Sequence, residues 1–375
     1  MASKDQTHYR VRSSAARSNS VRIDYGHLEA WCTSLLLAAG FRHQHARLVA
    51  ASLVDAEARG ISSHGIARVR IYSERLQAGL LSSSAEPSVA SETMASAHVD
   101  AGNAVGHAGA LAAQQVASDK ARAVGAGVAV VRNSNHCGTL GYFVRLAAEA
   151  GQIAIMATNG PPVMVYHGGR TRAVGTNPLA IGVPRADGPP LILDMATSAT
   201  ARGKIILAGQ NGQQIPSDWA VDIRGRPTTD PAAALEGAVV PFAGPKGSGL
   251  AMMIDLLCGG LAAAVTGEDI GDMYEDWTRE QRVSHLVIVL DPDTWIGGDA
   301  FRRHVTEFAK HVHDLPPAEG FDQVSLPGEP EEEARTTALE DGLVLPGGVF
   351  EDLAALGDDL GVDQPSVEPV VGTVD

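Results

Sequence analysis

Residues 127–157 have the sequence GVAVVRNSNHCGTLGYFVRLAAEAGQIAIMA, and this stretch decides the fold class. The β-branched run at 127–132 predicts a buried strand, and residues 140–150 carry apolar side chains at helical spacing. Residues 153–157 predict a second buried strand. Strand, helix and strand in direct succession are typical of an α/β sheet whose strands are buried on both faces.

The alternation extends along the chain, after an opening layer of helices. Apolar spacing closed by glycine predicts N-terminal helices at His27–Ala39, His45–Arg59 and Arg68–Ala78. Later helices are expected at Asn103–Val124, Gly249–Ala264 and Val349–Leu360, and later strands at Leu179–Val183, Leu191–Asp194 and His285–Leu290. We therefore expect an α/β fold with an N-terminal helical layer.

The region 321–348 is expected to be rich in loops. One of these loops is acidic, because it gathers Glu329, Glu331, Glu332 and Glu333. A second acidic segment, 267–282, is expected to be a solvated loop rather than a lid over a site.

Composition and charge indicate a globular chain that does not bind polyanions. The 375 residues are 45% hydrophobic and 19% charged, which is ordinary for a globular protein. The formal net charge is −15, whereas nucleic acid and anionic membranes are bound by clustered lysine and arginine. We expect neither as a partner.

Cysteine and signal content favour the cytoplasm. Cys32, Cys137 and Cys258 form neither a disulfide framework nor a CxxC pair. Residues 1–20 lack the apolar core of a secretory signal. No run reaches the roughly 18 uninterrupted apolar residues of a transmembrane helix.

Two glycine-rich segments fail the usual tests for nucleotide-binding loops. Residues 125–130 lack the third glycine of GxGxxG and precede a strand instead of following one. Residues 244–249 contain Lys246 but lack the spacing of a phosphate loop. Because this segment runs into a helix, Lys246 and the helix N-terminus form either an anion site or an ordinary turn with a solvated lysine.

Two histidine-containing turns suggest an enzyme that transfers protons. One is SSHGIAR at 62–68 and the other is SNHCG at 134–138. Imidazole changes charge near neutral pH, and a histidine next to glycine is suited to a turn beside a ligand. The alternatives are a structural role for His64 and a surface ion pair between Arg68 and Glu74.

Several segments, in order, resemble the malate/L-lactate dehydrogenase type 2 family, which includes ureidoglycolate, sulfolactate and diketogulonate dehydrogenases and cyclic imine reductases. The matching segments are 55–79, 131–151, 168–184, 194–204, 215–231, 241–257 and 327–329. The resemblance implies a mixed sheet with a non-Rossmann domain that binds NAD or NADP. It also implies a homodimer or higher homo-oligomer with its site near the subunit interface.

The resemblance also assigns roles at the proposed substrate site. It implies that His136 is the catalytic acid/base and that His64, beside Ser63, is a second catalytic histidine. Arg68 can hold a substrate carboxylate through two parallel hydrogen bonds, and Tyr72 can add a hydroxyl contact. His64 and Arg68 are expected on one helix, one turn apart.

The cofactor contacts implied by the resemblance are Gly160, Thr176, Asn177, Asp194, Met195, Ala196 and Lys246. Gly160 stands where relatives often have serine, so it is left with a backbone contact. Asp194 is also a candidate catalytic residue that orients a histidine or meets the nicotinamide or ribose. Its alternative role is to cap the helix that follows it.

The expected activity is hydride transfer between a 2-hydroxy acid and NAD or NADP, giving the 2-oxo acid. The alternative within the family is reduction of a cyclic imino acid. From other classes, an inactive cofactor-binding protein and a Ser–His hydrolase stay open, although Ser63 and Ser134 lack the GxSxG elbow. No metal is expected, because the pairs His43/His45 and His311/His313 diverge on a helix.

Four regions are expected along the chain. Residues 1–22 are a disordered extension, and 23–130 with 291–363 form a helical, substrate-binding domain. Residues 131–290 form the cofactor-binding domain, and 364–375 are a flexible tail.

Overall fold

The computed structural model describes residues 20–370, which fold around a seven-stranded mixed sheet. The strand order is β2 (Ser88–Glu92), β3 (Ser96–Asp100), β4 (Ala126–Ser134), β10 (Val283–Leu290), β5 (Ile153–Thr158), β6 (Leu179–Val183) and β7 (Leu191–Met195). The β3–β4 pair is parallel, and the other pairs are antiparallel. The mixed α/β fold is therefore confirmed.

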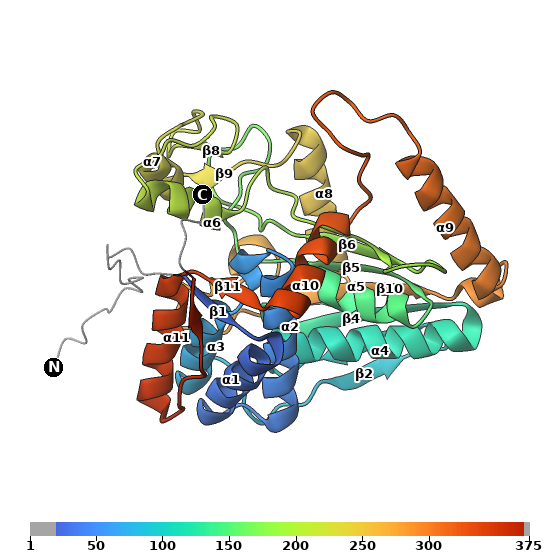
Figure 1. Cartoon of the computed structure of the whole chain (residues 1–375), viewed down its shortest axis with the longest axis horizontal. Helices are drawn as coiled ribbons and strands as arrows, with labels where there is room; N and C mark the ends of the chain where they lie inside the picture. Colours follow the sequence, from blue (N-terminus) through green and yellow to red (C-terminus); the bar gives the residue numbers. More distant parts are fainter. Residues whose placement is uncertain (1–19, 371–375) are drawn as a thin grey trace.

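Helices cover one face of this sheet in two layers (Figure 1). The inner layer is α4 (Gly106–Val124) and α5 (Leu140–Glu149). Gly127 lets α4 approach closely, because a Cβ there would lie 2.0 Å from the Ala117 carbonyl oxygen. The outer layer is α1 (Tyr25–Ala38), α2 (His43–Ala58), α3 (Arg68–Gln77) and α11 (Gly347–Leu360), which share a buried apolar core. The N-terminal helical layer is confirmed.

The opposite face is covered by α8 (Pro245–Asp255) and the π-helical turn Leu256–Gly260. Cys258 packs there with Ala157 and Leu286 of the sheet. The prediction of one helix over 249–264 is wrong at both ends. Asp255 accepts hydrogen bonds from Asn159 and from the backbone of Gly267, and the α-helix ends at this residue.

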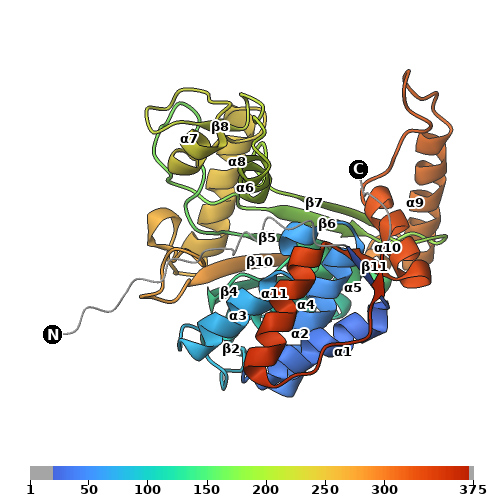
Figure 2. The ribbon, with the colours of Figure 1, turned by 60° about the vertical axis from the view of Figure 1, so that its left-hand side comes forward.

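A small lobe lies beside α8, on the side of the sheet opposite the helical layers (Figure 2). It contains α6 (Arg202–Gln210), α7 (Pro231–Glu236), β8 (Ala220–Val221) and β9 (Ala238–Val239). Buried Met164, Ile205 and Val239 form part of its core. The expected domain boundary at 130/131 falls inside β4, and the division into domains stays a prediction.

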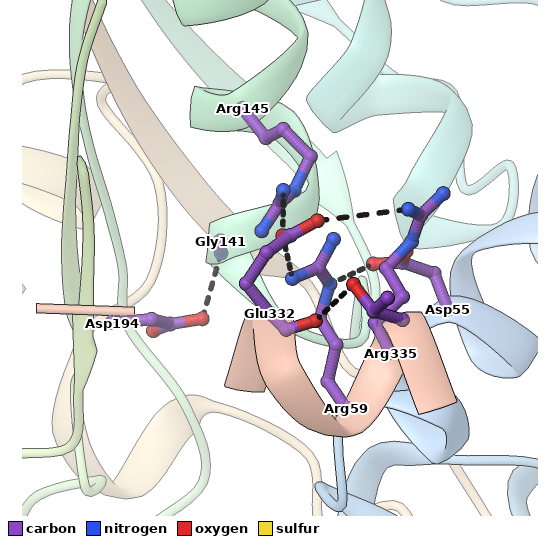
Figure 3. Close-up of polar contacts among 8 residues, drawn as sticks. Asp55, Arg59, Gly141, Arg145, Asp194, Glu332 and Arg335 are labelled. Carbon is purple, nitrogen blue, oxygen red and sulfur yellow. Dashed lines mark hydrogen bonds and ion pairs between the residues drawn. The ribbon is translucent and has the colours of Figure 1, made fainter. Parts of the chain in front are cut away.

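The region 321–348 corrects the expectation of loops. It contains α10 (Glu329–Asp341) and β11 (Leu343–Leu345), and it follows α9 (Gly298–His313), which comes after the 3-10 turn Pro292–Thr294. The acidic run begins α10, where Pro330 and negative charge suit the first turn of a helix. Glu332 then accepts hydrogen bonds from Arg59 and Arg145, each 2.8 Å long (Figure 3).

Both expected flexible ends are partly ordered. β1 (Val21–Ile23) pairs antiparallel with β11 and with β12 (Glu368–Pro369). The expectation is thus wrong for residues 21–22 and 368–369, whose backbone groups are satisfied by this pairing. Residues 1–19 and 371–375 lie outside the described residues. Within residues 20–370, no helix is long and apolar enough to cross a membrane.

Candidate active site

The carboxyl ends of β4, β5 and β7 lie at one edge of the sheet. β10 is antiparallel to both β4 and β5, and β6 is antiparallel to both β5 and β7, so these three strands point the same way. The segments after them carry His136, Gly160 and Ala196, which therefore gather at this edge. Ligands of open α/β sheets bind outside the carboxyl ends of strands.

A β-bulge directs the chain into the His136 turn. The pairing of β4 with β10 shifts between Val283 and His285, so β4 carries an extra residue there. Asn133 has φ +53°, a left-handed conformation that asparagine tolerates better than most residues. Bulges of this kind re-aim side chains beside active sites.

His136 is held through its Nδ1 atom. The Tyr72 hydroxyl lies 2.6 Å from Nδ1, and the backbone N–H of Gly138 donates to Nδ1 at 3.3 Å. Because the Gly138 N–H can only donate, Nδ1 is an acceptor and the proton of the neutral ring is on Nε2. Gly138 has φ +75°, and a Cβ there would meet the His107 ring at 2.9 Å.

His64 stacks on His136, as expected for two histidines sharing one site. The ring centroids are 5.4 Å apart and the planes are 21° from parallel. The Ser63 hydroxyl lies 3.0 Å from His64 Nδ1. The prediction that His64 and Arg68 share one helix is wrong. His64 belongs to a separate 3-10 turn, Ser62–His64, and a new helix begins at Arg68.

Arg68 begins α3 and turns back toward the histidine segment. Its Nε donates to the Ser63 carbonyl at 2.9 Å, and its guanidinium lies 5.1 Å from the centre of the Tyr274 ring. Glu74, the alternative ion-pair partner, lies 3.7 Å from Arg70. Arg68 therefore places a positive charge near the two stacked histidines.

The electrostatics keep His136, His64 and Tyr72 uncharged before substrate binds. Burial, reinforced by Arg68 and His64, holds the pKa of His136 well below 6.5. Burial and Arg68 lower the pKa of His64 to about 4. Burial raises the pKa of Tyr72, which keeps its proton. A carboxylate bound to Arg68 would offset the charge that opposes protonation of His136.

The acidic segment 267–282 packs against α3, so its description as a solvated loop is wrong. It begins with the 3-10 turn Gly267–Asp269. Arg75, which is 1% exposed, donates to the backbone carbonyls of Met273 (3.1 Å) and Asp276 (2.9 Å). The prediction missed Tyr274, although an aromatic residue within an acidic loop was a usable signal.

The structure brings Gly160, Thr176 and Asn177 together. The Asn177 side chain accepts from Gly160 N at 3.1 Å and donates to the Ala251 carbonyl at 2.9 Å, which ties this turn to α8. The Thr176 carbonyl accepts from both the backbone and the hydroxyl of Thr197. A Cβ on Gly160 would meet no atom within 4 Å, so open space adjoins this turn.

Asp194 caps a different helix from the expected one. Its Oδ2 accepts from the backbone N–H of Gly141 at 2.7 Å, at the start of α5 (Figure 3). Desolvation of the carboxyl raises the pKa of Asp194 to about 6, against hydrogen bonds from Gly141 and Leu140 that lower it. Neither His64 nor His136 is its hydrogen-bond partner among the described residues.

The remaining cofactor candidates occupy two places. Met195 ends β7 and Ala196 follows it, at the same sheet edge as the histidine turn. A cavity lined by Asp194 and Gly328 adjoins this strand. Lys246 is exposed in the first turn of α8, on the opposite face of the sheet from α4 and α5.

Sequence analysis missed two buried histidines near this edge. His285 lies between Ser134 and Thr158, at 2.8 Å from each hydroxyl oxygen. His107 is fully buried and packs edge-on against Tyr72. A histidine inside an apolar strand was the available signal for His285, but its partners are distant in sequence.

Known proteins resemble this chain over most of its length. Ureidoglycolate dehydrogenase (NAD(+)) from Escherichia coli K12 is 37% identical over 318 residues, covering 85% of this chain and 90% of that protein. Delta(1)-pyrroline-2-carboxylate/Delta(1)-piperideine-2-carboxylate reductase from Pseudomonas putida is 34% identical over 339 residues, covering 89% and 96%.

A solved structure shares the fold. Sulfolactate dehydrogenase from Methanocaldococcus jannaschii superposes with a TM-score of 0.85 at 34% identity, covering 92% of this chain and 98% of that one. The named relatives are dehydrogenases and reductases, which supports an oxidoreductase. Residues 23–354 match the malate/L-lactate dehydrogenase family. With its sheet, its paired histidines and these relatives, the chain belongs to the malate/L-lactate dehydrogenase family.

Proposed function

We propose that the chain is an NAD(P)-dependent oxidoreductase that interconverts a 2-hydroxy acid and its 2-oxo acid. The observation that carries the proposal is that Tyr72 and Arg68 of α3 lie beside His136, which follows the carboxyl end of β4. An acid/base group held at 2.6 Å by a hydroxyl stands near a cation that can bind a carboxylate. The open space at Gly160 supports a cofactor at the same edge.

The proton chemistry follows from the two nitrogens of His136. For oxidation, the ring proton moves from Nε2 to Nδ1, and Nδ1–H then donates a hydrogen bond to the Tyr72 oxygen. The freed Nε2 takes the proton of the substrate hydroxyl. The resulting imidazolium is stabilised by the substrate carboxylate held on Arg68. A bound nicotinamide would supply the acceptor for the C2 hydride. Reduction is the reverse, with His136 returning the Nε2 proton to the oxygen.

The residues fit a nicotinamide dinucleotide without a Rossmann loop. Gly160 and Asn177 form a turn beside open space, and Met195 and Ala196 follow the neighbouring strand at the same edge. Lys246 at the first turn of α8 supplies a cation and a helix N-terminus for phosphate. NAD and NADP are both retained as candidates.

A second candidate activity is reduction of a cyclic imino acid. The Pseudomonas putida reductase, which is 34% identical, supports it. The same Arg68 would hold the carboxylate, and His136 would face the ring nitrogen. A Ser–His hydrolase is less favoured, because Ser134 is fully buried on His285 and out of reach of a substrate. The other pair, Ser63 with its hydroxyl 3.0 Å from His64, lacks the GxSxG elbow.

The test is a substrate panel with both cofactors. Purified protein is mixed with NADH or NADPH and with pyruvate, oxaloacetate or piperideine-2-carboxylate, and loss of the reduced nicotinamide absorbance is followed. Oxidation with a 2-oxo acid supports the first activity, and oxidation with the cyclic imine alone supports the second. No cofactor binding in a fluorescence titration would refute both.

We also propose a homodimer in a reducing cytoplasm. Exposed apolar side chains gather on α6 and on the α8–π turn segment: Ile206, Leu207, Met252, Met253, Leu256, Leu257 and Leu261. Such a concentration is typical of a surface that pairs with a second copy. Light scattering on the wild type and Leu257→Glu tests the dimer, which the variant should weaken.

The three cysteines are free and buried, which supports a reducing compartment.

A further inference from the structure

We infer that His285 is a positioning residue that fixes the separation between the proton-transfer half and the cofactor half of the site. The inference rests on the proposed function. His285 touches neither the substrate position nor the cofactor turn directly. It acts through Ser134 and Thr158, the last residues of the two strands on either side of it.

The hydrogen bonds of His285 have one consistent direction. The Thr158 hydroxyl donates to the Asn159 and Ser284 carbonyls, both at 3.0 Å, so its oxygen accepts from Nδ1–H of His285 at 2.8 Å. Nε2 is then an acceptor for the Ser134 hydroxyl at 2.8 Å. The ring is fully buried, and burial lowers its pKa to about 3, so it stays neutral at working pH.

The side chain spans the sheet at the point where the site begins. β10 lies between β4 and β5, and His285 pairs with Thr158 in the β5 register. Ser134 is followed by the His136 turn, and Thr158 is followed by the Gly160 turn. One imidazole therefore joins the bases of the two turns.

The bulge makes this link more important than an ordinary cross-strand contact. The regular pairing of β4 with β10 is interrupted between Val283 and His285. The Ser134–His285 hydrogen bond crosses the interrupted part of the ladder. On the β5 side, Asn159 is fixed independently, since it accepts from Ser284 N at 2.8 Å and donates to Asp255 at 3.0 Å. The β4 end has contacts of its own as well, since Asn135 donates to the Ala104 carbonyl at 2.9 Å and His136 N donates to Gln281 at 3.1 Å. The imidazole is the side chain that joins this end to Thr158.

Hydride transfer needs the reacting atoms at near contact, and a misplacement of about 1 Å can cost roughly 100-fold in rate. Loosening the β4 end moves His136 relative to the cofactor turn and to the substrate, which Arg68 holds from α3. The expected loss is therefore in kcat, because Arg68 and the cofactor residues still bind their ligands.

The test uses Ser134→Ala and Thr158→Val, which each remove one partner of His285. The matched control is Ser118→Ala, because Ser118 is also buried and accepts a 2.9 Å hydrogen bond, from Gln114 within α4. We expect kcat to fall by about 10-fold or more in both test variants, with KM within about threefold. The deuterium isotope effect on kcat with deuterated reduced cofactor should rise, and the midpoint of the pH profile should not move.

Variants of His285 separate its two hydrogen bonds. His285→Gln places an amide near the Nε2 position and should retain the Ser134 contact, whereas His285→Asn should retain only the Thr158 contact. Because Ser134 lies two residues before the proton-transfer residue His136, we expect the Gln variant to keep more of kcat than the Asn variant. Equal losses, or a larger loss in Gln, would contradict the assignment.

Hydrogen exchange gives a readout that does not depend on activity. In Ser134→Ala, amides of 134–138 should exchange faster than in the wild type and in Ser118→Ala. If the wild type oxidises no cofactor with any substrate, the proposed function fails while exchange still decides the role of His285. Unchanged exchange in 134–138, or test variants with the kcat of Ser118→Ala, would overturn it.

Discussion

Removal of the Tyr72 hydroxyl is the sharpest perturbation of the acid/base assignment. In Tyr72→Phe, the 2.6 Å contact with His136 Nδ1 is lost, and Gly138 N–H at 3.3 Å is the remaining neighbour of that atom. The ring of Tyr72 is buried among apolar groups, which phenylalanine also satisfies. The fold should therefore be retained.

The size of the effect follows from the charge on His136 during the reaction. When His136 is an imidazolium, Nδ1–H donates to the Tyr72 oxygen, and a hydrogen bond to a charged group contributes about 1.5–3 kcal/mol. At 1.36 kcal/mol per tenfold, kcat should fall by roughly 10- to 150-fold. Because Tyr72 does not hold the substrate carboxylate, KM should stay within about threefold.

Steady-state kinetics with the best substrate of the panel measures this effect. Tyr25→Phe is the matched control, because Tyr25 is a partly buried tyrosine packed on the same helical core but remote from the histidines. Urea unfolding of both variants checks that stability is preserved. A Tyr72→Phe enzyme with wild-type kcat would refute the role given to the Nδ1 contact.

Three further outcomes are expected. Arg68→Lys should raise KM for the carboxylate substrate by about 10- to 100-fold, since an ammonium cannot form the two-point contact; unchanged KM would exclude the clamp. Oxidation requires neutral His136, so kcat/KM should stay level from alkaline pH down to well below pH 6.5 and fall only there; a midpoint at 6.5 or above would contradict the low pKa. Buried His107 and His285, each with a pKa lowered to about 3, stay neutral when folded but charge near 6.5 when unfolded, so these two residues should lower the free energy of unfolding by about 3 kcal/mol per unit as pH drops below 6.5, and His64 and His136 should add to this fall. Urea titrations at several pH values, compared with His285→Gln, measure this slope.

Local signals in the sequence sufficed for much of the fold. Apolar periodicity and glycine at helix ends predicted α1, α2, α3 and α5 closely, because these features act within a few residues. The helix α10 was missed for a different reason. Its acidic first turn was interpreted as part of a loop, although Pro330 marked a helix start and Glu332 is held by two arginines from distant elements.

The site shows the same division between local and distant information. His64 and Arg68 were predicted to share a pocket from their short spacing, and the His136 turn from its composition. The stacking of the two histidines, the Tyr72 contact and the Arg68–Tyr274 contact join segments far apart in sequence. Capping of the following helix was the alternative role predicted for Asp194, yet its partner Gly141 lies on a helix that precedes it. Such pairings are set by strand order, which no single segment encodes.

The central claim is that His136 exchanges the substrate proton during hydride transfer, and a single-turnover measurement tests it most directly. Enzyme saturated with reduced cofactor is mixed with substrate, and nicotinamide absorbance is followed for the wild type and for His136→Gln. We expect rapid oxidation by the wild type and a rate lower by about 100- to 10,000-fold in the variant, with similar cofactor affinity. A variant that oxidises the cofactor at the wild-type rate would contradict it.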